Sequence, residues 1–132
     1  METDSQFAIK CGGPQITSSD GIVYERDNET LGPATYYVTS SQRWAVSNVG
    51  YPSGATSSQY KFSSSNDVSN TVDFRLFQTC RLSASSLRYY GLGLENGNYT
   101  VNLEFAELVI PSVNRWWRLG RRAFDVYIQV RQ

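Results

Sequence analysis

Apolar and polar residues alternate with a period of two in residues 99–106 and 123–130. The apolar positions are Tyr99, Val101, Leu103 and Phe105 in the first segment and Phe124, Val126, Ile128 and Val130 in the second. Successive side chains of a strand point to opposite faces of its sheet, so this pattern predicts two half-buried strands. Asn96-Gly97, just before the first segment, predicts a tight turn because both residue types tolerate positive φ.

Shorter apolar runs predict further strands along the rest of the chain. One covers residues 72–82, and the others cover residues 7–11, 22–24, 36–38, 43–46 and 87–90. Residues 50–70 are rich in Ser, Gly, Asn and Pro, which predicts mainly loop. No helix longer than two turns is expected. Several short strands separated by turn signals indicate an all-β fold, either a β-sandwich or a jelly roll.

The length of the chain and its charge narrow the class of protein. With 132 residues it suits one domain, for which we expect an N-terminal extension at residues 1–6 and a domain at residues 7–132. The 12 basic residues balance the 12 acidic ones, so the electrostatic footprint of a nucleic-acid-binding protein is absent. No apolar run approaches the ~20 residues of a transmembrane helix, and the acidic N-terminal residues do not resemble a signal peptide.

Catalysis is disfavoured because the chain has no histidine. This removes the usual general base, the Ser-His-Asp and Cys-His arrangements and the commonest transition-metal ligand, and we expect no cofactor and no metal. A glycosidase needs only two carboxylates, but the odd spacing of Glu104 and Glu107 places them on opposite faces of a strand. Glu107 would instead need a partner such as Arg81 or Arg121.

Aromatic side chains are the other candidate chemistry, since their flat rings can stack on sugars. Candidates for this contact are Tyr36, Tyr37, Tyr51, Tyr89, Tyr90, Trp116 and Trp117. Packing between sheets is the alternative role for each ring. The adjacent pair Trp116-Trp117 favours binding most, because the side chains of consecutive residues diverge and one of them reaches solvent. Arg115 and Arg118 flank that pair and could bind hydroxyl groups or an acidic sugar.

Two further features bear on the compartment. Asn28-Glu29-Thr30 and Asn98-Tyr99-Thr100 match the acceptor pattern for N-glycosylation, which applies only to secreted or lumenal chains. Cys11 and Cys80 either form a disulfide or remain two separate thiols, and their spacing does not decide between the two.

A set of short motifs, in their order and spacing over about residues 7–129, resembles a known family. The motifs are Cys11-Gly12-Gly13, Phe77-Gln78-Thr79-Cys80-Arg81-Leu82, Leu87-Arg88-Tyr89-Tyr90-Gly91-Leu92, Asn96-Gly97-Asn98-Tyr99-Thr100-Val101, Phe105-Ala106-Glu107 and Gly120-Arg121-Arg122-Ala123-Phe124-Asp125-Val126-Tyr127-Ile128-Gln129. Together they are similar to the malectin-like domain that follows leucine-rich repeats in plant receptor-like serine/threonine kinases. The resemblance implies an extracellular, jelly-roll-like β-sandwich at the plasma membrane, lacking the family's last strands, with any kinase elsewhere in the gene.

The resemblance also implies a carbohydrate site, with departures. Animal malectin binds glucose-capped glycans through loop aromatics and a carboxylate, but this chain has Leu82, Val109 and Ile110 at three of the aromatic positions. Tyr51 is the counterpart of the remaining tyrosine, and the carboxylate would fall beyond Gln132. The segment from Glu107 to Gly120 is longer than its malectin counterpart and carries the two tryptophans.

Three functions follow from these patterns. The first is a non-catalytic ectodomain module that binds carbohydrate or cell-wall glycan through Tyr51, Arg115, Trp116, Trp117 and Arg118. The second is a structural module that contacts leucine-rich repeats or a co-receptor ectodomain without binding sugar. The third is a truncated fragment with no function of its own. In none of them does the segment itself contact the membrane.

Overall fold

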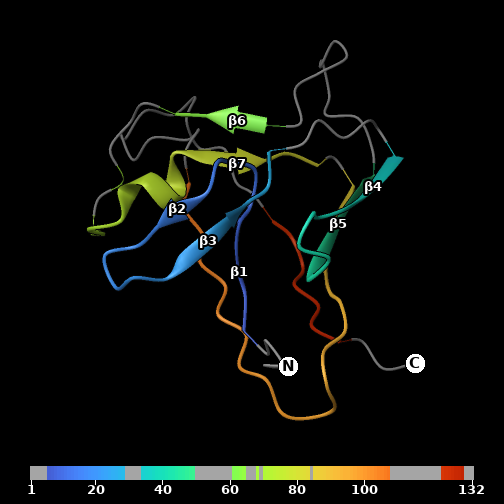
Figure 1. Ribbon diagram of the computed structural model, residues 1–132. Coiled ribbons are helices and arrows are strands. Elements are labelled where there is room, and N and C mark those ends of the chain that lie inside the picture. The colour runs from blue at the N-terminus through green and yellow to red at the C-terminus, as the bar shows by residue number, and fades with distance from the viewer. Residues whose placement is uncertain are drawn as a thin grey trace.

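The computed structural model describes residues 6–28, 34–49, 61–64, 68, 70–83, 85–107 and 123–129 (Figure 1). Its regular elements are the strands β1 (Ala8–Lys10), β2 (Ile16–Thr17), β3 (Val23–Arg26), β4 (Ala34–Val38), β5 (Trp44–Val49), β6 (Lys61–Ser63), β7 (Thr79–Arg81) and β8 (Ser86–Gly91), and one 3-10 turn, η1 (Phe74–Phe77). Among the described residues no helix is long and apolar enough to cross a membrane. The prediction of an all-β fold is confirmed.

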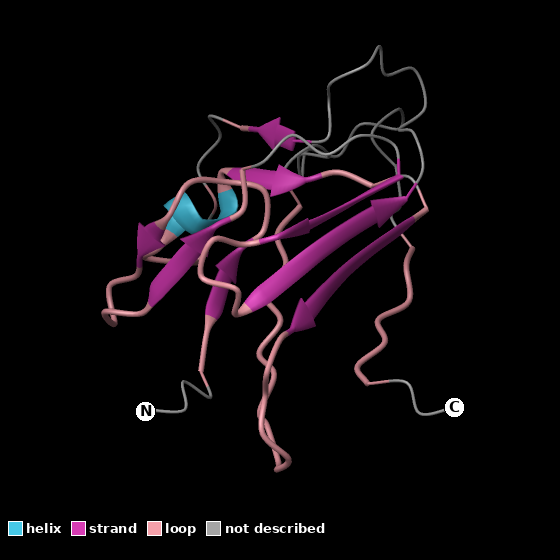
Figure 2. Ribbon diagram, turned by 45° about the vertical axis from the view of Figure 1, so that its right-hand side comes forward, coloured by secondary structure: helices cyan, strands magenta, loops and turns pink. Residues whose placement is uncertain are grey.

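The strands form three small sheets (Figure 2). In the first sheet β3 lies between β1, which is parallel to it, and β2, which is antiparallel. The second sheet is antiparallel with the order β4-β5-β8. The third pairs β6 with β7. Cross-strand neighbours in the second sheet place Val46 of β5 between Tyr37 of β4 and Tyr89 of β8, so these three side chains share one face.

The core lies where the second sheet faces β1. Trp44 and Val46, two residues apart on the central strand β5, are fully buried on one face. Ile9 of β1 and Phe7, just before β1, pack against them, as do Tyr37 and Tyr89 from the neighbouring strands. A central strand is buried most completely, because it has strands on both sides and a second layer over one face.

Most of the short predicted strands are confirmed. The segments 7–11, 22–24, 36–38, 43–46 and 87–90 each contain or overlap an observed strand. The run at residues 72–82 instead divides into η1 and β7. Within the predicted loop at residues 50–70 the structure has the short strand β6, and residues 50–60 lie outside the described part.

The two segments with the clearest alternation are not strands in the structure, and that prediction is wrong for residues 99–106 and for residues 123–129, the described part of the second segment. Their apolar side chains are exposed: Phe105 by 65% and Tyr127 by 74%. A strand exists only when its backbone pairs with a neighbour, and no described strand pairs with either segment. Asn96-Gly97 accordingly lies in a bend and not in a hairpin.

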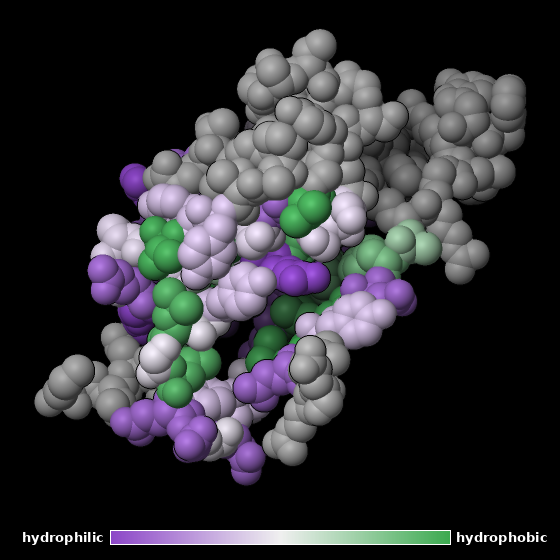
Figure 3. All heavy atoms as spheres, turned by 90° about the vertical axis from the view of Figure 1, so that its right-hand side faces the viewer, coloured by the Kyte–Doolittle hydropathy of each residue, from purple (hydrophilic) through white to green (hydrophobic). Residues whose placement is uncertain are grey.

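Those two segments still touch each other. The rings of Phe105 and Phe124 lie 5.4 Å apart between centroids. Figure 1 traces them as the orange and red paths beside and below the sheets. Apolar side chains, drawn in green, also reach the surface on the face shown in Figure 3.

Candidate functional site

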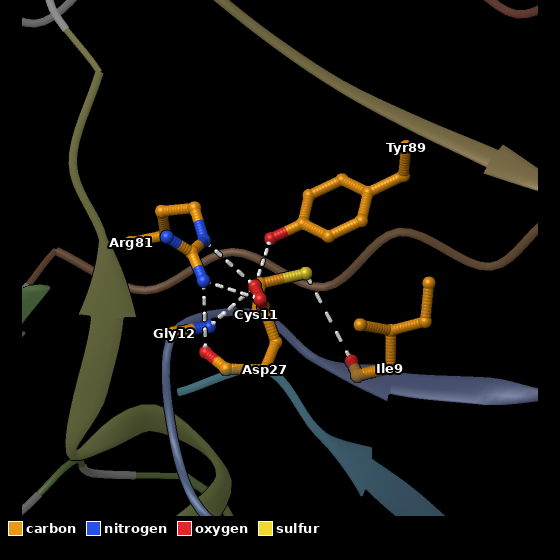
Figure 4. A network of polar contacts seen from close by, with 6 residues as sticks. All are labelled: Ile9, Cys11, Gly12, Asp27, Arg81 and Tyr89. Carbon is orange, nitrogen blue, oxygen red and sulfur yellow. Dashed lines mark hydrogen bonds and ion pairs between the residues drawn. The ribbon is translucent and has the colours of Figure 1, made fainter. Parts of the chain in front are cut away.

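A buried carboxylate, that of Asp27, joins four separate parts of the chain (Figure 4). Asp27 follows β3, and its Oδ2 accepts hydrogen bonds from the backbone N–H of Gly12 at 3.0 Å, from Nε of Arg81 at 2.9 Å and from the hydroxyl of Tyr89 at 2.6 Å. Nη2 of Arg81 also donates to Oδ1 and to the backbone oxygen of Asp27. Both side chains of the ion pair are fully buried. The arrangement satisfies a buried charge and therefore holds the structure together.

The pKa values of its members follow from this arrangement. Burial by itself would lower the pKa of Arg81, but the hydrogen bonds and the charge of Asp27 outweigh that effect and raise it. The pKa of Tyr89 is raised far above its usual value, by burial first and by nearby Cys11 and Asp27 next. Arg81 is thus a permanent cation and Tyr89 a permanent neutral donor, so neither is available for proton transfer near pH 7.

Gly12 allows this cluster to close. Its φ of +84° suits glycine, and a Cβ atom there would lie 2.1 Å from the backbone nitrogen of Arg81. No side chain fits in that space. The loop after β1 therefore lies so close to the backbone of β7 that only glycine fits at this position.

Lys10 and the cysteines border the same region. Lys10 is buried, and its Nζ donates to the backbone oxygen of Thr79 at 2.5 Å and to its Oγ1 at 2.9 Å. Burial lowers the pKa of Lys10 and raises that of Cys11, whose Sγ lies 3.9 Å from the backbone oxygen of Ile9. No disulfide joins Cys11 to Cys80 in the structure, and a bridge between them stays a prediction.

A second polar network is built around Glu25 of β3. Its Oε2 accepts hydrogen bonds from the indole N–H of Trp44 at 2.8 Å and from the hydroxyl of Ser41 at 3.1 Å. Its Oε1 lies 3.4 Å from Nη1 of Arg43. The carboxylate is therefore fixed by the buried core residue Trp44 on one side and by the β4–β5 turn on the other.

Beside Glu25 the surface is hollowed into a polar depression of about 350 Å³. The residues that line it are Gln15, Glu25, Arg26, Tyr37, Thr39, Ser40 and Ser41. They come from the β1–β2 loop, β3, β4 and the turn after β4, so the depression lies where the first and second sheets meet. Hydroxyl, amide, carboxylate and guanidinium groups surround a single tyrosine.

The structure tests few of the predicted site residues. Tyr51, Arg115, Trp116, Trp117 and Arg118 all lie outside the described residues. Asn28 and Asn98 are exposed, as glycosylation would require, although the modification itself stays a prediction. No group of three or more His, Cys, Asp or Glu residues in the described ranges could hold a metal ion.

Sequence reasoning missed the partners that matter most. It offered Arg81 or Arg121 as a partner of Glu107, which stays a prediction, and it did not pair Arg81 with Asp27, which lies 54 residues away in the sequence. Glu25 and Asp27 were not singled out at all. The one available signal was their place directly after the apolar strand predicted at residues 22–24, where a carboxylate close to the core needs a donor.

Comparison with known proteins gives a consistent result. The family model of the malectin domain matches residues 5–132. Two probable LRR receptor-like serine/threonine-protein kinases of Arabidopsis thaliana are 54% and 51% identical to this chain over 129 residues, which is 96% of the chain and 12% of each relative. A third from the same plant is 37% identical over 126 residues. The chain thus spans about an eighth of the length of these relatives, and no solved structure matches it.

Proposed function

Because the chain belongs to the malectin domain family, we propose that it is a non-catalytic extracellular recognition module of a receptor-like kinase and that it binds carbohydrate. The observation that carries this proposal is the family match over residues 5–132, together with relatives that are receptor-like kinases. The absence of histidine from the sequence supports a role without catalysis. Any kinase activity would belong to other parts of a longer protein.

The proposed sugar contacts are the aromatic and basic residues chosen from the sequence. Trp116 or Trp117 would stack on a sugar ring, with Tyr51 as a second contact. Arg115 and Arg118 would donate to hydroxyl groups. At roughly −0.3 kcal/mol per heavy atom a disaccharide reaches about ten micromolar at best, so the expected Kd is micromolar to millimolar.

A titration of the chain with maltose, cellobiose and cell-wall oligosaccharides tests this proposal. We expect saturable binding of at least one sugar, weakened about tenfold or more by Trp116→Ala or Trp117→Ala and less by Tyr51→Ala. Arg88, an exposed residue of β8, provides a control: Arg88→Ala should bind like the wild type. The proposal would be contradicted if no sugar bound, or if none of the three aromatic substitutions changed the binding.

An alternative role, contact with leucine-rich repeats or a co-receptor, is favoured by one observation. Residues 99–107 and 123–129 expose large apolar side chains, including Phe105, Phe124 and Tyr127. Exposed apolar surface of this kind marks protein contacts. Co-purification with a repeat ectodomain that depends on Phe124 and Tyr127, with no sugar binding, would favour this role.

Secretion is part of the proposal and has its own test. In a secretory host, glycans should be attached at Asn28 and Asn98, and substitution of each by Gln should remove one glycan mass. Thiol counting under denaturing conditions would show whether Cys11 and Cys80 are bridged there.

A further inference from the structure

We propose that the depression between β3 and the β4–β5 turn is a saccharide subsite, which takes one or two neutral sugar rings. Its lining comes wholly from described residues, in segments other than those that carry Tyr51 and Trp116-Trp117. This inference rests on the proposed carbohydrate-binding function, and it adds the place where a ligand binds.

The floor of the depression is preorganised. Glu25 is held by three groups, the indole N–H of Trp44, the hydroxyl of Ser41 and the guanidinium of Arg43. Thr39 is fixed as well, because its Oγ1 donates to the backbone oxygen of Trp44 at 3.1 Å and lies 3.0 Å from Oγ of Ser41. A ligand therefore meets polar groups that are already ordered, which lowers the entropic cost of binding.

The lining suits a ligand with many hydroxyl groups. A sugar hydroxyl both donates and accepts, and the depression offers each counterpart: carboxylate and hydroxyl oxygens accept, while the Gln15 amide and the Arg26 guanidinium donate. Both signs of charge are present, from Glu25 and Arg26, so a neutral polar ligand pairs with the surface better than an ion of either sign. Such a mixture is expensive to bury against an apolar ligand.

Tyr37 supplies the one aromatic ring. It packs against Trp44 and Val46 from β4 and is half-buried, so its position is set by the core while part of it lines the depression. A ring fixed in this way can cover the apolar face of a pyranose.

The size of the depression limits the ligand. Its volume of about 350 Å³ lies at the lower end of the roughly 300–1,000 Å³ of small-molecule sites. One or two rings fit this volume, and a longer glycan would extend from it into solvent.

The test is an NMR titration of the 15N-labelled chain with methyl α-glucoside, maltose and cellobiose, each up to about 20 mM so that millimolar Kd values are covered. The indole N–H of Trp44 is the specific reporter, because it donates to Glu25 at the floor of the site. Its resonance is assigned by its loss in Trp44→Phe. We expect saturable shifts of this resonance and of the amides of Arg26 and residues 39–41.

Two exposed lining residues provide the variants, Arg26→Ala and Gln15→Ala, since neither belongs to the core. Arg26→Ala should raise the Kd measured at the Trp44 indole about tenfold or more, and Gln15→Ala should raise it severalfold. Tyr37→Phe keeps the aromatic ring, so it should raise the Kd only through the loss of the hydroxyl group. Arg88→Ala is the matched control and should leave the Kd unchanged. Preserved peak dispersion shows that each variant is folded, and if one variant unfolds the other decides.

The outcomes separate this inference from the proposed function. Saturable sugar binding that leaves the Trp44 indole and residues 39–41 unshifted, or that neither Arg26→Ala nor Gln15→Ala weakens, overturns the subsite while carbohydrate binding stands. No saturable shift with any of the three sugars overturns the subsite, and if the wider panel is also negative, the proposed function falls with it.

Discussion

Arg81 of β7 and Asp27, which follows β3, form a fully buried ion pair in which Nε of Arg81 donates to Oδ2 of Asp27 at 2.9 Å. Replacing one member leaves the charge of the other in the interior, which costs about 3–5 kcal/mol. We therefore expect Asp27→Asn to lower the free energy of unfolding by about that amount in urea titrations.

Two variants frame this measurement. Asp20→Asn, at an exposed carboxylate, should change stability by less than about 0.5 kcal/mol. The double variant Asp27→Asn, Arg81→Met should recover much of the loss, since no charge is then buried. A loss below about 1 kcal/mol in Asp27→Asn alone would show that the pair is not buried as described.

A comparison of Gly12 with Gly21 distinguishes two reasons why a position requires glycine, a steric clash of the Cβ atom and a left-handed backbone conformation. Both have a positive φ, +84° and +83°. A Cβ at Gly12 would lie 2.1 Å from the backbone of Arg81, whereas no atom of the described residues would lie within 4 Å of a Cβ at Gly21. Gly21→Ala should cost about 1–2 kcal/mol, from the left-handed conformation alone. Gly12→Ala should cost more than about 4 kcal/mol or prevent folding. Thermal unfolding of the two variants compares them directly, and equal losses would contradict the close approach.

Tyr89 should make the protein sensitive to alkali. Its pKa is raised in the folded state, so above about pH 10 the unfolded chain loses a proton that the folded protein keeps, and stability falls as pH rises. The slope for one such group reaches about 1.4 kcal/mol per pH unit. We expect Tyr89→Phe to be less stable near pH 7 but to show a shallower decline between about pH 10 and 12.

The shifted pKa values of Cys11 and Lys10 also change the stability of the protein with pH, so the experiment must account for both. The raised pKa of Cys11 acts in the same direction from a lower pH, so the comparison is made in a Cys11→Ser background. The lowered pKa of Lys10 acts in the opposite direction, because stability rises with pH until the unfolded lysine is deprotonated. The difference in slope between the two proteins is therefore the informative quantity, and equal slopes would show that Tyr89 is not held neutral by the fold.

Asn48 is a weak point in the core. It is fully buried on β5, and within the described part of the chain neither its Nδ2 nor its Oδ1 has a hydrogen-bond partner. An unsatisfied buried amide costs about 1–3 kcal/mol, so Asn48→Leu should stabilise the protein by about 1 kcal/mol, provided that the volume fits. Asn48→Asp should destabilise it by burying a charge. Urea midpoints measure both, and a less stable Asn48→Leu would indicate a partner for the amide.

The strands that were predicted correctly from the sequence have both an apolar pattern and a neighbouring strand in the described sheets. Residues 44–46 are an example, since they are fully buried and belong to β5, which lies between β4 and β8. Residues 99–107 carry a clearer pattern, but no strand in the described ranges pairs with them. Alternation indicates which residues could share a face of a sheet and does not supply the neighbouring backbone. The family resemblance, in contrast, depended on the order and spacing of short motifs and was confirmed.

The candidate site was harder to predict for a different reason. The buried carboxylate at Asp27 and the fixed one at Glu25 depend on donors far away in sequence, such as Tyr89, 62 residues from Asp27. No periodicity or spacing rule pairs such residues. The depression likewise arises only where two sheets meet, so its lining carries no motif.

The cluster around Asp27 also constrains the order of folding. It gathers residues separated by as many as 62 positions, and the neighbouring contact of Lys10 with Thr79 spans 69. During synthesis the Asp27 carboxylate has no guanidinium partner until Arg81 of β7 has been made. It has no phenol partner until Tyr89 of β8 has followed. Closing such long loops is slow, so the N-terminal half should stay unfolded until most of the described chain has been synthesised.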